Sequence, residues 1–328
     1  MQHRKLGKTG FLVSEISLGT WQVGGKWGEP FRPDNAERIL HAAADAGINF
    51  IDTADVYGDG ASEKAVGRFV RDRSERLYVA TKCGRRLQPH VADAYQPAAL
   101  RRFVEDSLRN TGLDTLDLVQ LHCPPTEVYY RPEIFELFDR LREEGKVQHL
   151  GVSVEKVEEG LKALEFASVA TVQLIFNMFR QRPPERLFTE AARRDVGLIV
   201  RVPLASGLLT GKFTADTHFS TDDHRQFNRN GEAFDKGETF AGVDYATGLA
   251  AVAELELALG GAAPLAALAL RWILMFGEVS CVIPGASSPD QVLANLQAAD
   301  LPPLTPTQMQ AVREVYERRI KALVHQSW

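Results

Sequence analysis

Three apolar runs in the first half of the chain each end on an ionisable side chain. The run 48–51 leads into Asp52, the run 77–81 leads into Lys82, and the run 116–121 leads into His122, while Tyr57 follows Asp52 by five residues. Taken singly, each has an ordinary structural explanation, such as a solvated strand end or a turn. If parallel strands carry them, the strand ends meet at one rim and gather an acid, a base and a phenol there.

Such a set suits the reduction of a carbonyl group. Hydride addition to C=O creates an alkoxide-like oxygen, which needs a proton donor and electrostatic stabilisation in one place. The phenol of Tyr57 has an ordinary pKa near 10, and a close Lys82 ammonium is expected to lower it. Asp52 is the available carboxylate to keep a buried Lys82 charged. His122 is expected to hydrogen-bond the carbonyl oxygen and direct it toward Tyr57.

The elements that hold these side chains alternate along the whole chain. Short β-branched runs predict strands over 13–19, 48–54, 77–82, 116–122, 147–153, 171–177, 198–204 and 281–285. Amphipathic segments between them predict helices near 34–46, 62–71, 97–111, 133–144, 155–166 and 184–194. Eight such units predict a parallel sheet closed into a (β/α)8 TIM barrel, in a single domain over residues 1–328. An open doubly wound sheet is the alternative, but no G-x-G-x-x-G follows an early strand.

Two segments depart from a bare barrel. Residues 6–12 contain two glycines between short apolar stretches, which predicts an N-terminal β-hairpin covering the barrel floor. Residues 213–244, after the seventh strand, are polar and aromatic without a clear period. A loop of that length is usually functional or disordered.

The composition of the chain limits the kinds of partner and compartment that we expect. The 328 residues are 45% hydrophobic and 25% charged, as in a folded globular chain, and the net charge of −5 gives no basic footprint for nucleic acid. Three cysteines without a C-x-x-C pair, and an N-terminus without an apolar export core, predict a reducing cytoplasm. The apolar segment 257–277 contains Pro264 and Arg271, so we expect buried helices there and no membrane insertion.

The four ionisable residues, in the contexts Phe50-Ile51-Asp52-Thr53-Ala54 and Gln120-Leu121-His122, resemble the catalytic tetrad of the aldo-keto reductase superfamily. The resemblance spans nearly the whole chain, to bacterial-type members and to the branch that includes potassium-channel beta subunits. It implies a (β/α)8 barrel that binds an extended nicotinamide cofactor without a Rossmann domain. It also implies that Tyr57 is the general acid in reduction and the base in oxidation.

The same resemblance implies a set of cofactor-binding residues. Ser153 and Gln173 match carboxamide ligands, although Val154 replaces a common Asn, and Arg201 stands where many members stack an aromatic ring on the nicotinamide. The segment 201–212 resembles the loop that folds over the pyrophosphate. The implied cofactor residues are Gly19, Thr20, Trp21, Asp52, Ser153, Gln173, Arg201, Pro203, Leu204, Ser206, Gly207, Leu208, Lys212, Gly285, Ser287, Gln291 and Asn295.

The adenosine end bears on cofactor choice. Ser288-Pro289-Asp290-Gln291 predicts a capping box that opens a helix after the eighth strand, and a helix N-terminus attracts phosphate. Strongly NADP-selective members commonly have basic residues where Ser287 and Gln291 stand. This sequence departs from that pattern, but NADP(H) is still favoured on family grounds, with NAD(H) as the alternative.

The substrate is less defined. An apolar or aromatic carbonyl compound is expected, with aldoses left open and oligomeric state undetermined. The expected pocket residues are Trp21, Trp27, Val56, Tyr57, His122 and Tyr129. A cofactor-sensing regulatory subunit with little turnover is the alternative function. A metal-dependent hydrolase is a third, for which the eight histidines show no H-x-H or H-E-x-x-H spacing, so no metal site is expected.

Overall fold

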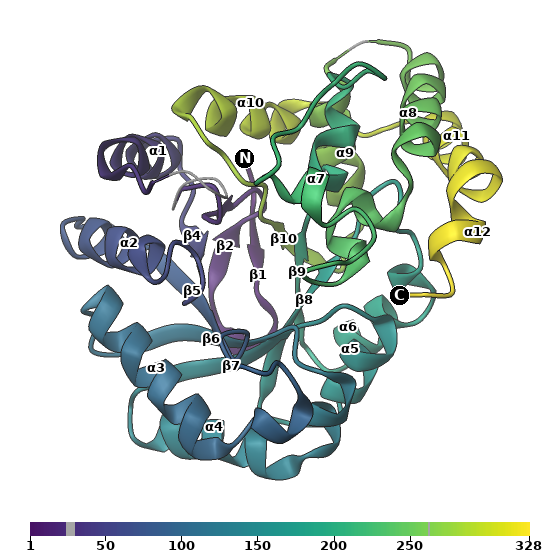
Figure 1. Cartoon of the computed structure of the whole chain (residues 1–328). Helices are drawn as coiled ribbons and strands as arrows, with labels where there is room; N and C mark the ends of the chain where they lie inside the picture. Colours follow the sequence, from purple (N-terminus) through teal and green to yellow (C-terminus); the bar gives the residue numbers. More distant parts are fainter. Residues whose placement is uncertain (24–29, 262) are drawn as a thin grey trace.

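Eight parallel strands pair in the order in which the chain makes them (Figure 1). The computed structural model describes residues 1–23, 30–261 and 263–328. The strands are β3 Leu18–Gly19, β4 Phe50–Asp52, β5 Tyr78–Cys83, β6 Leu116–His122, β7 Val147–Ser153, β8 Val169–Ile175, β9 Gly197–Arg201 and β10 Val279–Val282. With helices between them, they form the α/β, TIM-barrel-like fold that the alternation predicted.

The first and last strands lie side by side at a seam. Parallel bridges join Ile16 to Val282 and Gly19 to Gly285. The backbones approach closely here, because a Cβ added to Gly19 would lie 2.7 Å from the carbonyl oxygen of Ile283. Only glycine fits at this position without moving one of the two backbone segments.

Helices alternate with the strands and surround the sheet (Figure 1). Those that follow strands are α1 Pro33–Asp45, α2 Ala61–Arg71, α3 Pro97–Thr111, α4 Pro132–Glu143, α5 Val157–Ala163, α6 Leu187–Arg193 and α10 Pro289–Asp300. The later part of the chain adds α7 His224–Phe227, α8 Tyr245–Leu259, α9 Leu265–Leu274, α11 Pro306–Val315 and α12 Lys321–Val324. In the part of the chain that the structure describes, no helix has the length and apolar character needed to cross a bilayer.

The predicted bounds of α3, β6 and β7 agree with the structure, but the predicted first strand over 13–19 is wrong. That run divides between β2 Leu12–Ser14, which pairs antiparallel with β1 His3–Lys5, and β3 in the main sheet. Glu15 separates the two strands. It is buried and accepts hydrogen bonds from Gln2 N at 3.1 Å and from Arg4 Nε at 3.1 Å, which ties the turn to β1.

The β1–β2 pair packs against the inside of the main sheet. Leu6, Phe11 and Val13 share a buried cluster with Leu118 and Ile199. The turn between β1 and β2 contains a short 3-10 helix, η1 Gly7–Thr9, rather than strand. The sequence predicted both strands of a hairpin within residues 6–12. The paired strands are instead β1, which ends before this stretch, and β2, which begins at its last residue.

Residues 213–244, here called the strap, follow the turn after β9. The expected aperiodic loop contains α7 and the 3-10 helices η6 Lys236–Glu238 and η7 Phe240–Gly242. A further 3-10 segment, η5 Ala205–Thr210, lies between β9 and the strap.

Candidate active site

The structure brings the four predicted catalytic side chains together. Asp52 ends β4, Lys82 lies in β5, His122 ends β6, and Tyr57 lies in the turn after β4. The Lys82 ammonium contacts Asp52 Oδ1, and it donates to Thr53 O at 2.9 Å and to the Tyr57 hydroxyl at 3.3 Å. The rings of Tyr57 and His122 meet edge to face with centroids 6.1 Å apart. A phenol, an ammonium and an imidazole thus adjoin one another where the strands end.

Burial and charge set the protonation of these groups. Burial opposes the charge on Lys82, but Asp52 and Tyr57 together outweigh it, so the Lys82 pKa lies above its ordinary value. Burial also raises the pKa of Tyr57, and the Lys82 ammonium opposes this without reversing it. The expectation that Lys82 makes Tyr57 more acidic than usual is therefore wrong for this structure, because loss of water around the phenol has the larger effect. Burial, followed by the Arg85 guanidinium, lowers the pKa of His122 well below its ordinary value, so the imidazole is neutral.

Two amides complete the hydrogen bonds of Asp52. Gln120 Nε2 in β6 donates to Asp52 Oδ2 at 2.9 Å, and Gln173 Nε2 in β8 donates to the same oxygen at 2.8 Å. Ser153 Oγ donates to Gln173 Oε1 at 3.3 Å. The two expected carboxamide ligands, Ser153 and Gln173, therefore lie side by side and already have partners within the protein. Gln120 was missed, although the period of two along a strand places it on the same face as His122.

The loop after β3 reaches the same rim. Gly19 lies at the seam beside Gly285, and Thr20 Oγ1 donates to Asp52 O at 3.0 Å. Trp21 follows with a half-buried side chain. Gly19 and Thr20, two of the expected cofactor residues, therefore adjoin the main chain of Asp52.

Arg201, at the end of β9, is held by three acceptors. Its Nη2 donates to Glu155 Oε2 at 2.8 Å and to Val154 O at 3.1 Å, and it lies 3.4 Å from Cys123 Sγ. Because Cys123 directly follows His122, the guanidinium lies beside the catalytic rim. Its planar face suits stacking on an aromatic ring, which stays a prediction.

The turn after β9 has a backbone shape that suits an anion. Val202, Ala205, Ser206 and Gly207 have φ angles of 50°, 47°, 54° and 100°. Such turns gather backbone N–H groups into a concave nest that binds phosphate. A Cβ on Gly207 would lie 2.8 Å from Phe213, so the turn needs glycine for both conformation and space. The N–H groups of Ala205 and Gly207 already donate to Val202 O and Leu204 O within the turn, so a pyrophosphate site here stays a prediction. The other expected residues here are Pro203, Leu204, Leu208 and the exposed Lys212.

The start of α10 differs in detail from its prediction. Ser288 Oγ accepts from Gln291 N at 3.3 Å, which is the expected cap. However, Gln291 Oε1 accepts from Ser287 N at 2.8 Å and from Ser287 Oγ at 3.1 Å, not from the N–H of Ser288. The reciprocal half of the predicted capping box is therefore wrong, because Ser287 offers two donors to the glutamine. Asn295 Nδ2 donates to Gly285 O at 3.3 Å, which ties α10 to the seam.

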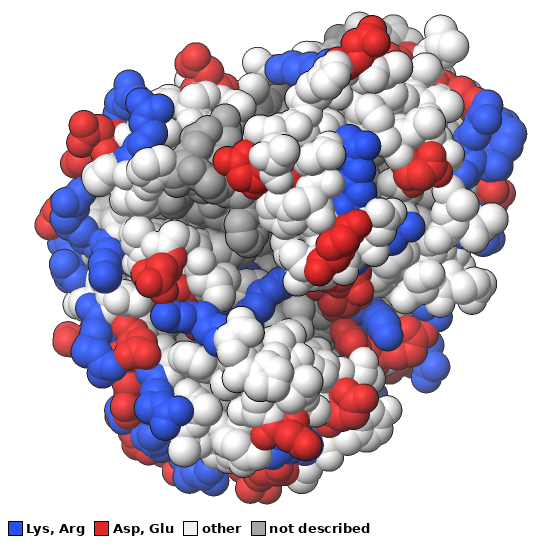
Figure 2. All heavy atoms as spheres, viewed as in Figure 1, with Lys and Arg blue, Asp and Glu red and all other residues white. Residues whose placement is uncertain are grey.

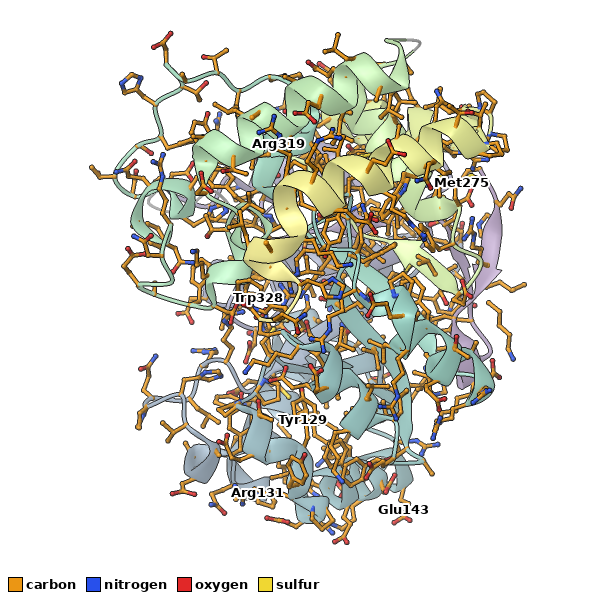
Figure 3. The ribbon with its side chains drawn as sticks, turned by 90° about the vertical axis from the view of Figure 1, so that its right-hand side faces the viewer. Tyr129, Arg131, Glu143, Met275, Arg319 and Trp328 are labelled. Carbon is orange, nitrogen blue, oxygen red and sulfur yellow. The ribbon has the colours of Figure 1, made fainter. Side chains whose placement is uncertain are left out.

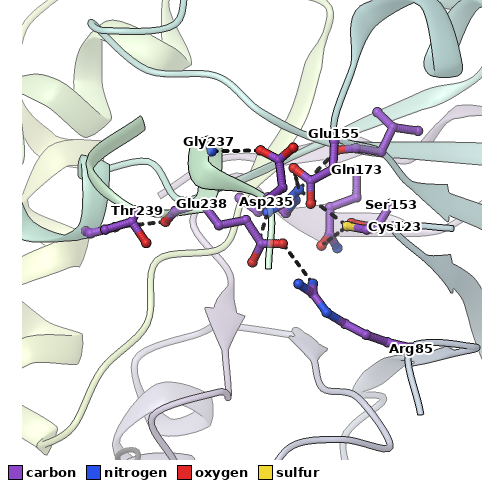
Figure 4. A network of polar contacts seen from close by, with 12 residues as sticks. Arg85, Cys123, Ser153, Glu155, Gln173, Asp235, Gly237, Glu238 and Thr239 are labelled. Atoms are coloured by element: carbon purple, nitrogen blue, oxygen red, sulfur yellow. Dashed lines mark hydrogen bonds and ion pairs between the residues drawn. The ribbon is translucent and has the colours of Figure 1, made fainter. Parts of the chain in front are cut away.

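A second charged group at the rim was missed from the sequence (Figure 4). Arg85 Nη1 donates to Glu238 Oε1 at 2.8 Å, and Arg201 Nη1 lies 3.8 Å from Glu238 Oε2. Burial raises the pKa of Glu155 well above its ordinary value. Burial opposes ionisation of Glu238, but the Arg85 and Arg201 guanidinium groups outweigh it and lower its pKa. Arg85 and Glu155 closely follow strand ends, which is a usable signal, whereas nothing in the sequence singles out Glu238.

The same group has the composition of a metal site. Cys123, Glu155 and Glu238 each offer one ligand atom, all within 4.8 Å of one another. Arg85 and Arg201 already bind the two carboxyl groups, and burial raises the pKa of the Cys123 thiol. The geometry is that of an ion-pair network.

Asp55, two residues before Tyr57, is a buried acid that the sequence reasoning passed over. Neither of its carboxylate oxygens has a hydrogen-bond partner among the described groups. Burial, with the nearby Glu63 second, raises its pKa to about 7.

The expected pocket residues lie in different surroundings. Trp21 and Val56 are half-buried, and the Trp21 ring meets His224 of the strap edge to face at 5.3 Å. Tyr129 is fully buried in the core, and Trp27 lies outside the described residues. The face toward the viewer is hollowed near its middle, with basic and acidic side chains around the hollow (Figure 2).

Comparison with known proteins decides the family. The sequence profile of the Aldo/keto reductase family matches residues 15–317. The chain belongs to the aldo/keto reductase family. Among solved structures, this aldo/keto reductase resembles the glycerol dehydrogenase AKR11B4 from Gluconobacter oxydans, with 33% identity, a TM-score of 0.77, and 97% of this chain and 96% of that chain covered.

Two relatives are informative for their names. Aldo-keto reductase YhdN from Bacillus subtilis (strain 168) is 30% identical over 90% of this chain and 87% of its own. The NADH-specific methylglyoxal reductase from Escherichia coli (strain K12) is 28% identical over 97% of this chain and 100% of its own. This aldo/keto reductase is thus an oxidoreductase that acts on carbonyl or alcohol groups.

Proposed function

We propose that the protein reduces aldehyde or ketone carbonyls to alcohols with NADP(H), and that Tyr57 is the general acid. The observation that supports this most is the hydrogen bond from the Lys82 ammonium to the Tyr57 hydroxyl beside the neutral ring of His122. The nicotinamide cofactor, when bound, supplies the hydride. The protein's part is to hold the carbonyl, deliver a proton and stabilise the charge that develops.

Each side chain then has a defined task. The neutral His122 donates an N–H to the carbonyl oxygen and turns it toward Tyr57. Tyr57 transfers its phenolic proton to that oxygen as the alkoxide develops, and the Lys82 ammonium stabilises the phenolate left behind. Asp52, held by Gln120 and Gln173, keeps Lys82 charged. In the alcohol-to-carbonyl direction Tyr57 accepts the proton.

Replacing Tyr57 with Phe tests the acid role. Because one positioned acid contributes about 10²–10⁴-fold, turnover should fall by at least about a hundredfold while cofactor affinity stays close to that of the wild type. Near-normal turnover with intact cofactor binding would contradict the role of Tyr57. Turnover by the wild type also separates a reductase from a cofactor-sensing subunit.

The cofactor would lie across the nest after β9 and the start of α10. Family membership favours NADP(H), whereas the name of the Escherichia coli relative makes NADH a real competitor. Ser287 and Gln291 are uncharged and bonded to each other, so neither offers the cation that a 2′-phosphate prefers. Titration of the protein with NADPH and with NADH decides the choice, and a clear preference for NADH would overturn this part of the proposal.

For the substrate, we propose small carbonyl compounds. Two relatives are named for a small substrate, one for methylglyoxal and one for glycerol. The charges of Arg85 and Glu238 at the rim suit polar substituents better than the aromatic ones first expected. We also propose that residues 1–328 form a single cytoplasmic domain, for which the three buried free cysteines give support.

A further inference from the structure

The strap crosses the rim and touches the ends of several strands. His224 meets Trp21 after β3, and the Phe234 ring lies under the Arg85 guanidinium after β5, 5.4 Å from its carbon. Glu238 binds Arg85 and approaches Arg201 at the end of β9. The position of this one segment therefore determines what surrounds the catalytic rim.

Trp328, which follows the C-terminal helix α12 (Figure 3), packs against the strap. Its side chain is only 8% exposed, and its indole Nε1 donates to Asp235 Oδ1 at 2.7 Å. The Arg180 guanidinium lies 4.4 Å from the centre of the indole ring, and Arg182 Nη1 donates to the main-chain oxygen of Trp328 at 2.9 Å. Both arginines follow β8, so the indole links the barrel to the strap.

The fit between indole and strap leaves no spare room. A Cβ on Gly237 would lie 2.9 Å from Trp328, and a Cβ on Gly242 would lie 2.6 Å from it. The backbone of the strap thus rests directly on the indole at two points, one in η6 and one in η7. This geometry is specific to a large flat side chain with a donor at its edge.

A short chain of contacts leads from the indole to the active site, and Figure 4 shows its part from Asp235 to Arg85. Asp235 Oδ1, the acceptor of the indole, also accepts from Gly237 N at 2.7 Å and so fixes the first turn of η6. Glu238 is the last residue of that helix, and Ser206 Oγ donates to its carbonyl at 3.0 Å. The Glu238 carboxylate then meets Arg85 and Arg201, and Arg201 contacts the residue after His122.

We propose that Trp328 is a positioning residue for the reaction: it fixes η6 so that Glu238 docks on Arg85 and Arg201, and thereby holds the strap closed over the catalytic rim. The consequence for turnover rests on the proposed function, but the consequence for the strap itself does not. Within residues 1–23, 30–261 and 263–328, the hydrogen bonds and the ring contact of Trp328 involve Asp235, Arg182 and Arg180, which belong neither to the tetrad nor to the expected cofactor segments. Its effect is therefore transmitted through Asp235 and Glu238.

Two variants separate the parts of the contact. Trp328→Phe keeps a ring for Arg180 but removes the donor to Asp235, whereas Trp328→Ala removes both. Leu257→Ala, at an 84% exposed position in α8, is the matched control. The first readout is hydrogen–deuterium exchange of residues 235–242, which needs neither cofactor nor substrate. The second is the rate of cofactor release, followed by the fluorescence of the reduced nicotinamide.

We expect residues 235–242 to exchange fastest in Trp328→Ala, more slowly in Trp328→Phe and slowest in the wild type. Leu257→Ala should exchange at the wild-type rate. Since a hydrogen bond to a charged group and an aromatic contact are lost, cofactor release should quicken by about tenfold in Trp328→Ala. A general loss of stability would lower the melting temperature and speed exchange throughout the barrel, so exchange confined to the strap distinguishes positioning from a purely structural role.

A second test asks whether Trp328 acts through Glu238. Glu238→Gln alone should also speed cofactor release, and in the Trp328→Ala background it should add little, because the docking is already lost. Fully additive effects, or unchanged exchange of 235–242 in Trp328→Ala, would overturn the proposal. Altered exchange in a protein without measurable turnover would leave the strap anchor standing and refute only the proposed function.

Discussion

The buried pair of Lys82 and Asp52 gives the sharpest test of how the site is held. The two side chains are 1% and 2% exposed. Lys82→Met keeps the length of the side chain but removes the ammonium, with its contacts to Asp52 Oδ1, Thr53 O and the Tyr57 hydroxyl. Removing one partner of a buried ion pair costs about 3–5 kcal/mol, because the other charge is left uncompensated.

The structure places the expected loss at the lower end of that range. Asp52 Oδ2 keeps its bonds from Gln120 and Gln173, so only part of the carboxylate is left without a donor. We therefore expect Lys82→Met to lower the free energy of unfolding by about 3 kcal/mol in urea titrations. Adding Asp52→Asn should restore a large part of it, because the buried charge is then gone.

The matched control is Lys146→Met. Lys146 also pairs with two carboxylates, those of Glu105 and Glu144, but on the surface, where ion pairs contribute little. The free energy of unfolding should stay nearly unchanged in this variant. The account of a mutually dependent buried pair would be refuted if Lys82→Met lowered the free energy of unfolding no more than this control does. It would also be refuted if adding Asp52→Asn to Lys82→Met lowered that free energy further.

Two further predictions concern stability. The pKa of Asp55 is about 7 in the folded protein and near 3.9 in the unfolded chain. Between these pH values the folded state binds one proton more than the unfolded state, so the free energy of unfolding falls as pH rises from about 4 to 7. Asp55→Asn should remove about 3 kcal/mol of that fall between pH 4.5 and 7.5, measured by urea unfolding at both pH values, and an unchanged pH dependence would contradict it. Gly19→Ala should destabilise the seam by about 1–3 kcal/mol, because its Cβ meets Ile283 O, whereas Gly277→Ala, with open space around it, should have little effect on the thermal midpoint. Equal midpoints for the two alanine variants would count against the close approach at the seam.

The local pattern of the chain was enough to predict much of the fold. Helix α3 and strands β6 and β7 agree with their predicted bounds, because an apolar face or a continuous apolar run marks them without competition. The segment 13–19 could not be divided correctly, since its division depends on Glu15 bonding to Arg4, a contact made only in the folded chain.

Part of the candidate site could likewise be predicted from the sequence, and part could not. Asp52, Lys82 and His122 could be found because each lies at or next to the carboxyl end of a strand, and strand ends converge. The net effect on the Tyr57 pKa could not, because it depends on how completely the phenol is buried. Glu238 lies in a segment without periodicity, and only the folded strap brings it to Arg85.

The two amide side chains that donate to Asp52 also limit how the sequence of the barrel can change in evolution. Gln120 and Gln173 come from β6 and β8, and neither strand is a neighbour of β4, where Asp52 lies. The carboxylate thus acts as a cross-brace through the interior as well as the counter-ion of Lys82. Changes at these three positions should be strongly epistatic, so lineages that alter one of them should show compensating changes at the other two, even though the three lie far apart along the chain.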